Sequence, residues 1–147
     1  MKPTKKALTK MMREFENACR KADLKVTHQR LEVYRELAQS VNHPSAEMLY
    51  TQLIKKLPTI SLDTIYRALA TFEKHHLITR VQTNKSQARY EAKMEQHHHA
   101  VCSICGTITD FTWDYFDEAL VPEELNGWGI VNKKNAVLEG ICKACSR

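Results

Sequence analysis

The sequence has no long run of apolar residues. None of its stretches approaches the ~18 consecutive apolar residues that a membrane-spanning helix needs. The first residues, 1–6, have no apolar core of the kind that a secretory signal peptide requires. We therefore expect a cytoplasmic protein that is not attached to a membrane.

The cysteines do not suit a disulfide framework, because there are five of them and one would stay unpaired. Four form two Cys-x-x-Cys pairs, Cys102 with Cys105 and Cys142 with Cys145, and in a reducing cytosol such pairs favour metal binding. Each two-residue gap lets one tight turn present both sulfurs to the same ion. We predict a tetrahedral zinc site whose closed shell of four thiolates has a structural role and no chemical one. Disulfide bonds or a redox pair are the alternatives.

The motifs of common zinc enzymes are missing as well. The sequence contains neither the His-Glu-x-x-His motif of zinc peptidases nor the Cys/His pattern of zinc deaminases. A metalloenzyme that uses the histidine-rich segment 97–99, with Glu91 as general base, is the catalytic alternative. We predict that the protein is not an enzyme.

Acidic residues are scarce in the first part of the chain. Residues 1–90 contain 17 Lys and Arg against 8 Asp and Glu, whereas residues 91–147 contain 5 against 9. A basic part joined to an acidic part is typical of a protein in which only one part binds a polyanion. A lysine-rich surface that is merely solvated would give the same balance.

Helical patterns fill the first 75 residues. Residues 5–22 carry apolar side chains at steps of three and four, with Cys19 on the apolar stripe, where it is expected to be a buried small hydrophobe. Thr27, Ser45 and Ser61 are predicted N-caps of three further helices.

Segments 78–83 and 88–92, separated by a turn at residues 84–86, are predicted to form a hairpin. Helices followed by a basic hairpin indicate a winged helix-turn-helix over residues 1–90, with the helix after Ser61 in the DNA major groove. An ordinary helical domain with a surface hairpin is the alternative.

After residue 96 the pattern changes to short strands. We expect strands at 99–102, 107–111 and 136–141 and a helix around residues 114–125. Residues 97–147 would thus form a small α/β domain closed by zinc, and residues 91–96 a hinge. The predicted fold class is α+β, a winged helix followed by this zinc-stapled domain.

Two histidines in the second part suggest another metal site. His97 and His99 are two residues apart on a predicted strand, so their side chains face one side while His98 faces the other. Glu91 and Asp110 could add carboxylate ligands. A mixed nitrogen and oxygen set suits Fe²⁺, Mn²⁺, Co²⁺ or Zn²⁺. A surface or tag-like histidine run is the alternative.

Several segments together resemble the ferric uptake regulator family of metal-dependent transcription factors, over nearly the whole chain. The matching segments are Thr27-x-Gln29-Arg30, His43-Pro44-Ser45-Ala46-Glu47, Ser61-Leu62-Asp63-Thr64-Ile65-Tyr66-Arg67, Arg89-Tyr90-Glu91, His97-His98-His99-x-x-Cys102-x-x-Cys105-Gly106, Asp110-Phe111 and Cys142-x-x-Cys145. The resemblance implies a homodimer with an N-terminal winged helix and a C-terminal dimerisation domain. It also implies repression of genes when a sensor metal is bound.

The resemblance further assigns roles to individual residues. It implies structural zinc on the four paired cysteines and a sensor metal on five residues, His43, Glu91, His97, His99 and Asp110. It assigns the main DNA contacts to Tyr66 and Arg67, and we add Thr64, Arg30 and Lys74 as candidates. Arg67 can bind guanine edges or phosphate, whereas Tyr66 can contact thymine methyls or have a packing role.

The resemblance leaves the signal open between two kinds of family member. Peroxide-responsive repressors sense hydrogen peroxide with Fe²⁺ through histidines at the positions of His43 and His97. Asp110 favours that kind, whereas Glu91 is more typical of iron sensors. The expected function is a metal-dependent repressor of an inverted-repeat DNA operator, responsive to hydrogen peroxide, with Fe²⁺ or Mn²⁺ in the sensor site and Zn²⁺ possible there. The alternative is an iron- or zinc-uptake regulator that senses metal only.

Overall fold

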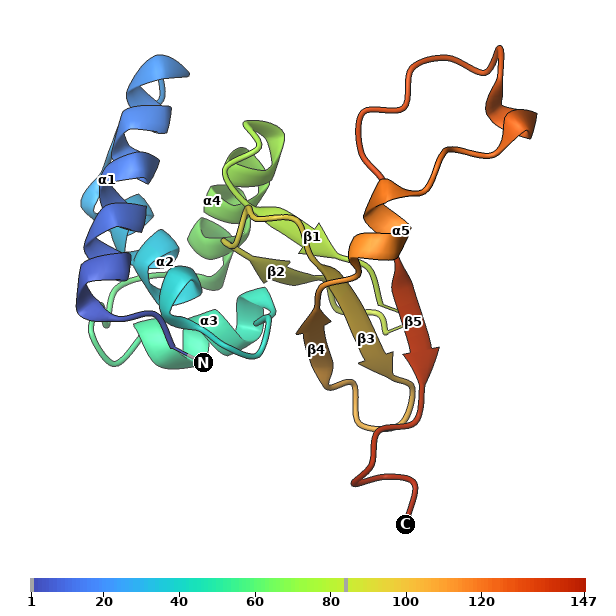
Figure 1. Ribbon diagram of the computed structural model, residues 1–147. Helices are drawn as coiled ribbons and strands as arrows, with labels where there is room; N and C mark the ends of the chain where they lie inside the picture. The colour runs from blue at the N-terminus through green and yellow to red at the C-terminus, as the bar shows by residue number, and fades with distance from the viewer. Residues whose placement is uncertain (1, 84) are drawn as a thin grey trace. The chain divides into compact units, whose positions relative to one another are not determined.

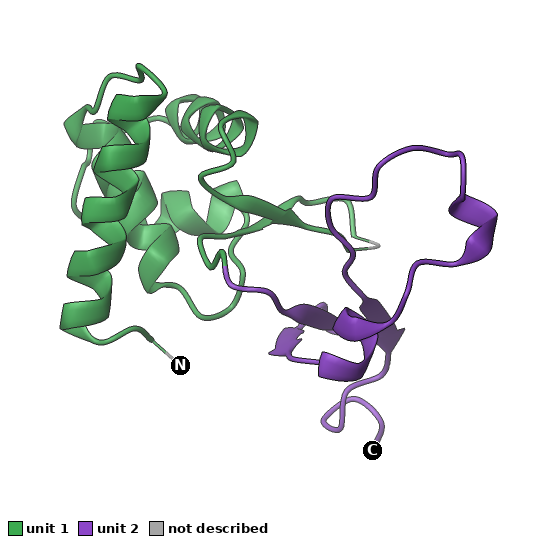
Figure 2. Cartoon of the chain, turned by 45° about the horizontal axis from the view of Figure 1, so that its top comes forward, with its two compact units in different colours: residues 1–94 green, residues 95–147 purple. Residues whose placement is uncertain are grey.

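Four helices and a two-stranded hairpin make up the first of two units in the protein. The computed structural model describes residues 2–83 and 85–147, and the chain divides after residue 94 into this unit and a second one, Glu95–Arg147 (Figures 1 and 2). Helices supply most of the first unit, and a small sheet is the main element of the second.

The helices of the first unit begin where short polar side chains can cap them. In each case the cap hydroxyl accepts a hydrogen bond of 3.1 to 3.2 Å from the backbone N–H three residues later, which satisfies a donor that the helix itself leaves open. The predicted caps Thr27, Ser45 and Ser61 are confirmed, and Thr4 is a fourth. The helices are α1 (Lys5–Lys21), α2 (His28–Gln39), α3 (Ala46–Leu53) and α4 (Leu62–Lys74).

Three aromatic rings form the centre of the first core. Phe15 of α1 stacks on Tyr34 of α2 with ring centroids 4.0 Å apart, and Phe72 of α4 meets both rings edge-on. Such offset and edge-to-face contacts add to the free energy of burial. Cys19 lies in the same core with 1% of its surface exposed, and burial raises the pKa of its thiol. The prediction that Cys19 is a buried hydrophobe is therefore confirmed.

A short antiparallel hairpin completes the first unit. Its strands are β1 (Thr79–Val81) and β2 (Arg89–Glu91), which pair with Arg80 opposite Tyr90. The predicted turn includes Asn84, which lies outside the described residues. Helices α3 and α4 followed by this hairpin form the expected winged helix.

The second unit is built on a three-stranded sheet in the order β4-β3-β5. Strand β3 (His98–Cys102) pairs antiparallel with β4 (Ile108–Phe111) and parallel with β5 (Val137–Gly140). Parallel neighbours need a long crossover, and here the residues between β4 and β5 provide it. The three predicted strands are confirmed, and the fold class is α+β as expected.

The helix predicted around residues 114–125 is wrong in its second half. Helix α5 covers only Asp114–Glu118, and a separate 3₁₀ turn, η1, covers Glu123–Leu125. Pro122 explains the break, because proline disfavours the helical conformation of the preceding residue and cannot donate to a helical hydrogen bond. Among the described residues, no helix is long and apolar enough to cross a membrane.

Candidate metal centres and nucleic-acid interface

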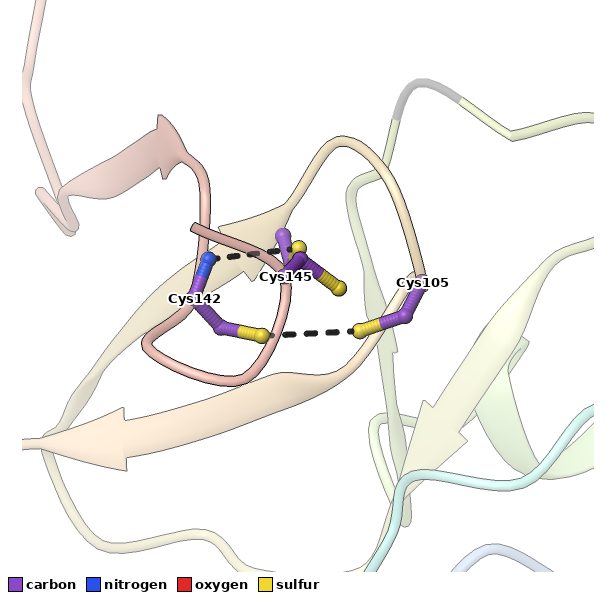
Figure 3. A group of neighbouring side chains, drawn as sticks. Cys105, Cys142 and Cys145 are labelled. Carbon is purple, nitrogen blue, oxygen red and sulfur yellow. Dashed lines mark hydrogen bonds between the residues drawn. The ribbon is translucent and has the colours of Figure 1, made fainter. Parts of the chain in front are cut away.

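The four paired cysteines of the second unit meet in one cluster. Their sulfur atoms all lie within 4.8 Å of one another, and Sγ of Cys105 is 3.8 Å from Sγ of Cys142 (Figure 3). Four sulfurs placed ~2.3 Å from a tetrahedral zinc ion are ~3.8 Å apart, so the donor set and its spacing fit zinc. The distance is too long for a disulfide bond.

Two tight turns bring the sulfurs together. The first follows β3, where the N–H of Gly106 donates to the carbonyl of Cys102 and Gly106 has a positive φ of 76°, a conformation that glycine adopts without strain. The second follows β5, where the N–H groups of Cys145 and Ser146 both donate to the carbonyl of Cys142. Pairing of β3 with β5 places the two turns at the same end of the sheet.

The protonation of the cysteines also favours a bound cation. Hydrogen bonds from the backbone N–H groups of Cys142 and Cys105 lower the pKa of the Cys102 thiol to about 6. Neighbouring sulfurs, first that of Cys142, raise the pKa of the Cys145 thiol to about 12. One sulfur of the cluster is thus readily ionised, whereas another keeps its proton unless a positive charge lies between them. A divalent metal ion supplies that charge and allows all four to be thiolates.

A second group of possible ligands lies on the same sheet. His97 precedes β3, His99 lies within it, and the register places His99 directly opposite Asp110 of β4. The Nε2 atoms of His97 and His99 are 3.1 Å apart, and Oδ1 of Asp110 is 3.4 Å from Nε2 of His99. Two nitrogens bound at right angles and ~2.1 Å from one ion are ~3.0 Å apart, so the two histidines have the spacing of adjacent metal ligands. Oδ1 of Asp110 is farther from Nε2 of His97, at 3.9 Å.

A backbone carbonyl fixes the tautomer of His97. Its Nδ1 lies 2.6 Å from the carbonyl oxygen of Glu95, which can only accept a hydrogen bond, so Nδ1 carries the proton. The lone pair of the neutral ring is then on Nε2, the atom that faces His99 and Asp110. A hydrogen bond of this kind orients most histidine ligands of metal ions.

The first unit holds a further imidazole beside a carboxylate. His43, in the loop before α3, and Glu91, at the end of β2, are both buried, and Nε2 of His43 is 3.1 Å from Oε2 of Glu91. The backbone of His43 has a positive φ of 50°, which is uncommon for a residue other than glycine. Conformations of this kind are found where surrounding contacts enforce them, frequently at functional sites.

The side chain of Arg89 supplies those contacts. Its guanidinium donates to the carbonyl oxygens of His43 and of Asn42, the second at 2.6 Å, and the N–H of Tyr90 donates to the carbonyl of Pro44 at 3.0 Å. Burial lowers the pKa of Arg89, but the shift leaves so basic a group charged. Strand β2 therefore holds the 42–44 loop by its carbonyls, and this places the His43 ring beside Glu91.

His98 faces the opposite side of β3, as its position in the strand predicts. It is fully buried, and its Nδ1 accepts a hydrogen bond from the N–H of Ala136, so the ring proton is on Nε2, 3.1 Å from Oδ1 of Asp117. Oδ1 of Asp117 accepts a hydrogen bond from the side-chain amide of Gln96. His98 thus ties α5 and the start of β5 to β3 and belongs to the core of the second unit.

The residues proposed for DNA binding lie mainly on α4. Tyr66 is 42% exposed, and the exposed Arg67 forms an ion pair of 2.9 Å with Asp63. Thr64 and Lys74 lie on the same helix, and the Thr64 hydroxyl is hydrogen-bonded to the Ser61 cap. Arg30 lies on α2, where its guanidinium donates to the carbonyl of Lys25, so it also holds a loop.

The model of the ferric uptake regulator family matches residues 21–134. The chain belongs to the ferric uptake regulator family. It is therefore a metal-responsive transcription regulator and not a metalloenzyme, and the resemblance expected from the sequence is confirmed.

Three relatives of this family illustrate the similarity. The peroxide-responsive repressor PerR of Staphylococcus epidermidis is 31% identical over 127 residues, which are 86% of this chain and 84% of the relative. The peroxide operon regulator of Bacillus subtilis is 26% identical over 137 residues, 92% and 94% of the two chains. The structure of the Helicobacter pylori ferric uptake regulator Fur, described as having three functional metal binding sites, superposes with a TM-score of 0.76 at 28% identity, covering 95% of this chain and 94% of that one.

Some residues of these centres have no pattern that would find them in the sequence. Arg89 belongs to a matching family segment, but nothing near it shows that it binds the loop around His43. Asp117 is a single acidic residue on a helix, where solvent exposure is the ordinary expectation. Their partners are far away in the chain, so only the folded structure identifies them.

Cys142→Ser should remove the zinc from the purified protein. Loss of one thiolate opens the tetrahedral shell, and because structural zinc contributes on the order of 10 kcal/mol to folding, the second unit should lose its ordered sheet. Metal analysis and the protection of β3 amides from hydrogen exchange measure the two effects. Cys19→Ala is the matched control, since Cys19 lies in the other core. Retention of zinc by Cys142→Ser would contradict the four-cysteine site.

Arg89→Ala should lower the free energy of unfolding of the first unit by about 2 kcal/mol, because two charge-assisted hydrogen bonds to loop carbonyls are lost. Arg80→Ala is the control from the neighbouring strand, where the ion pair with Glu73 is exposed and should contribute at most about 1 kcal/mol. Urea unfolding followed by the helical circular dichroism signal compares them. Equal losses would show that Arg89 does not brace the loop.

Proposed function

We propose that this protein is a metal-dependent DNA-binding repressor whose sensor site uses ligands from both units. The observation that carries the proposal is that each unit presents buried imidazole groups beside a carboxylate, at distances suited to metal ligands. They are His43 with Glu91 in the first unit, and His97 with His99 and Asp110 in the second. Family membership supports reading the two groups as parts of one site.

A single ion held by all five residues would couple metal binding to the placement of the two units. Nitrogen and oxygen ligands in this proportion suit Fe²⁺ or Mn²⁺, and also Zn²⁺, whereas the four-cysteine cluster suits structural Zn²⁺ alone. Binding of an operator with two half-sites depends on the separation of the two DNA-binding units. The ion then favours DNA binding to the extent that it binds more tightly to the competent arrangement.

The proposed DNA contacts are Tyr66 and Arg67, with Thr64, Lys74 and Arg30 around them. Exposure of Tyr66 and Arg67 on α4, the second helix of the motif, supports this assignment. Residues 1–90 contain 17 basic residues against 8 acidic ones. The basic side chains would neutralise phosphates and make DNA binding salt-dependent.

We propose that the second unit forms the homodimer. All residues from 118 to 133 are exposed, and they run from the end of α5 into the long loop that leads to β5 (Figure 1). It carries large apolar side chains that no core covers, including Leu120 at 94%, Trp128 at 70% and Ile130 at 84% exposure. A surface of this kind is typical of a protein interface, and a second copy of the chain would bury it symmetrically and allow an inverted-repeat operator to be read.

We further propose that hydrogen peroxide is the signal. Support comes from the two peroxide regulators among the relatives and from Asp110 in the second group of ligands. Fe²⁺, when bound there, would supply the electron that splits the O–O bond of peroxide. His43 and His97 are the side chains expected to be oxidised, and a modified ring would no longer hold the site together.

Binding to an operator should require the sensor metal and His43. An inverted-repeat duplex is first selected from random DNA with the metal-loaded protein and labelled with a fluorophore. Protein from which a chelator has removed the sensor metal but not the zinc is then titrated with Mn²⁺ in the presence of this duplex. Mn²⁺ should raise affinity by at least tenfold, a typical allosteric coupling. His43→Asn should lose this response, because asparagine keeps the positive φ but lacks the imidazole.

The control for that experiment is His76→Asn. His76 is exposed and also has a positive φ, 57°, so this variant makes the same chemical change at a position outside both groups of ligands. It should respond to Mn²⁺ like the wild type. Metal-independent operator binding by the wild type would contradict the proposed repressor, and a normal Mn²⁺ response of His43→Asn would contradict the shared site.

Peroxide should abolish operator binding by the Fe²⁺ form and leave the Mn²⁺ form active. The expected chemical change is the addition of one oxygen atom to His43 or His97, detected by mass analysis of the two peptides. Unchanged binding of the Fe²⁺ form after peroxide, with unmodified histidines, would favour the alternative of an iron- or zinc-uptake regulator that senses metal only.

A further inference from the structure

The ring of Tyr66 is anchored to the preceding helix by a hydrogen bond. Its hydroxyl donates to the carboxylate of Glu47, which lies in the first turn of α3, 19 residues earlier in the chain. The phenol is nevertheless 42% exposed, so the ring is available while its polar end is occupied. Tyr66 is thus held from both helices of the helix-turn-helix motif.

The charges of the pair keep the proton on the tyrosine. The hydrogen bond from Tyr66 lowers the pKa of Glu47, and the same bond raises the pKa of the phenol. Glu47 is therefore an anion and Tyr66 a neutral donor at neutral pH. Hydrogen bonds to an ionised acceptor are about twice as strong as those between neutral groups, so the phenol hydroxyl is poorly available to bases or phosphates.

Arg67, the next residue, has an acidic partner of its own. Asp63 lies one turn earlier on α4, and its carboxylate is 2.9 Å from Nε of Arg67. Both side chains of this pair are largely exposed, with 81% for Arg67 and 69% for Asp63, so the contact is weak and Arg67 can leave it. The bond between Glu47 and Tyr66 differs, because it joins two helices and fixes a ring.

We propose that Glu47 is a positioning and specificity-determining residue for DNA recognition: its carboxylate fixes the Tyr66 ring as an apolar reading surface and repels phosphates of wrongly placed DNA. This inference rests on the proposed DNA-binding function. With its hydroxyl held by Glu47, Tyr66 recognises a base through the carbons of its ring, and the thymine C5-methyl is the group in the major groove that offers such a contact.

A negative charge beside a DNA-contacting side chain also weakens binding to DNA in a way that contributes to sequence specificity. Non-specific binding depends on the attraction of Lys and Arg to phosphates, and a carboxylate at the contact surface weakens it for every sequence. Only DNA that places a thymine methyl against Tyr66 regains the binding free energy that this repulsion removes. Discrimination through a repulsive group of this kind is a general way to reject wrong partners.

Four variants separate the two roles of Glu47. Glu47→Ala removes both the charge and the hydrogen-bond acceptor, and Tyr66→Phe removes only the bond. Glu47→Gln removes the charge but keeps an acceptor for the phenol. Glu14→Gln is the charge-matched control, because Glu14 is an exposed residue of α1, outside the helix-turn-helix motif. Thermal unfolding and Mn²⁺ content establish that each variant is folded and loaded.

The measurement is the dissociation constant of each Mn²⁺-loaded variant for the selected inverted-repeat duplex and for a scrambled duplex of equal composition. Specificity is the dissociation constant for the scrambled duplex divided by that for the selected duplex. Glu47→Ala and Tyr66→Phe should lower this ratio about tenfold, the range of a single base contact. Glu47→Gln should bind the scrambled duplex about fivefold more tightly, as for the loss of one repulsive charge ~4 Å from a phosphate.

Deoxyuridine provides a readout that a merely structural role would not change. Each thymine of the selected duplex is replaced in turn by deoxyuridine, which lacks only the methyl group. The wild type and Glu47→Gln should bind severalfold more weakly when one thymine per half-site is changed, whereas Glu47→Ala and Tyr66→Phe should be indifferent at that position.

The outcomes distinguish the inference from the function on which it rests. Wild-type ratios and deoxyuridine profiles in both Glu47→Ala and Tyr66→Phe would overturn the role of Glu47 while leaving the repressor intact. A fivefold gain in scrambled-duplex affinity for Glu14→Gln as well would attribute that effect to net charge and overturn the local repulsion. A wild type that does not discriminate between the duplexes would overturn the DNA-binding function itself.

Discussion

The register of β3 against its two neighbours decides where the four cysteines and the His97, His99 and Asp110 group of the second unit lie. Pairing with β4 sets His99 opposite Asp110, and pairing with β5 brings the turn after Cys102 next to the turn that contains Cys142. Because side chains alternate along a strand, a slip by one residue would turn His99 into the core and His98 out of it. The buried His98 holds this register, and zinc bound by the four cysteines would hold it too, so it would support the proposed sensor ligands through the sheet.

Backbone carbonyl groups orient the histidines of both units. The carbonyl of Glu95 fixes the tautomer of His97, and in the first unit Arg89 holds the carbonyls of Asn42 and His43. These contacts prepare the rings before any ion is bound, which reduces the conformational entropy that metal binding would otherwise have to offset. The uncommon backbone conformation of His43 is maintained in the same way, by contacts from a neighbouring strand.

The first unit combines a basic composition with acidic residues next to the side chains proposed to contact DNA. Glu47 and Asp63 contact Tyr66 and Arg67 on a domain whose overall balance favours polyanions. General attraction to phosphates sets the affinity for DNA of any sequence. Local repulsion at the proposed recognition helix would instead set the difference in affinity between one DNA sequence and another.

The sequence alone determined the features that depend on neighbouring residues. The N-caps, the apolar stripe with Cys19, the strands and the two Cys-x-x-Cys turns all arise from interactions within a few residues, so their patterns are visible locally. The helix predicted through residue 125 is wrong after residue 118 because Pro122 interrupts it. Tertiary structure alone decided the pairs His43 with Glu91, Arg89 with the 42–44 loop and Tyr66 with Glu47. Their members are 19 to 48 residues apart and meet only once helices and strands have packed.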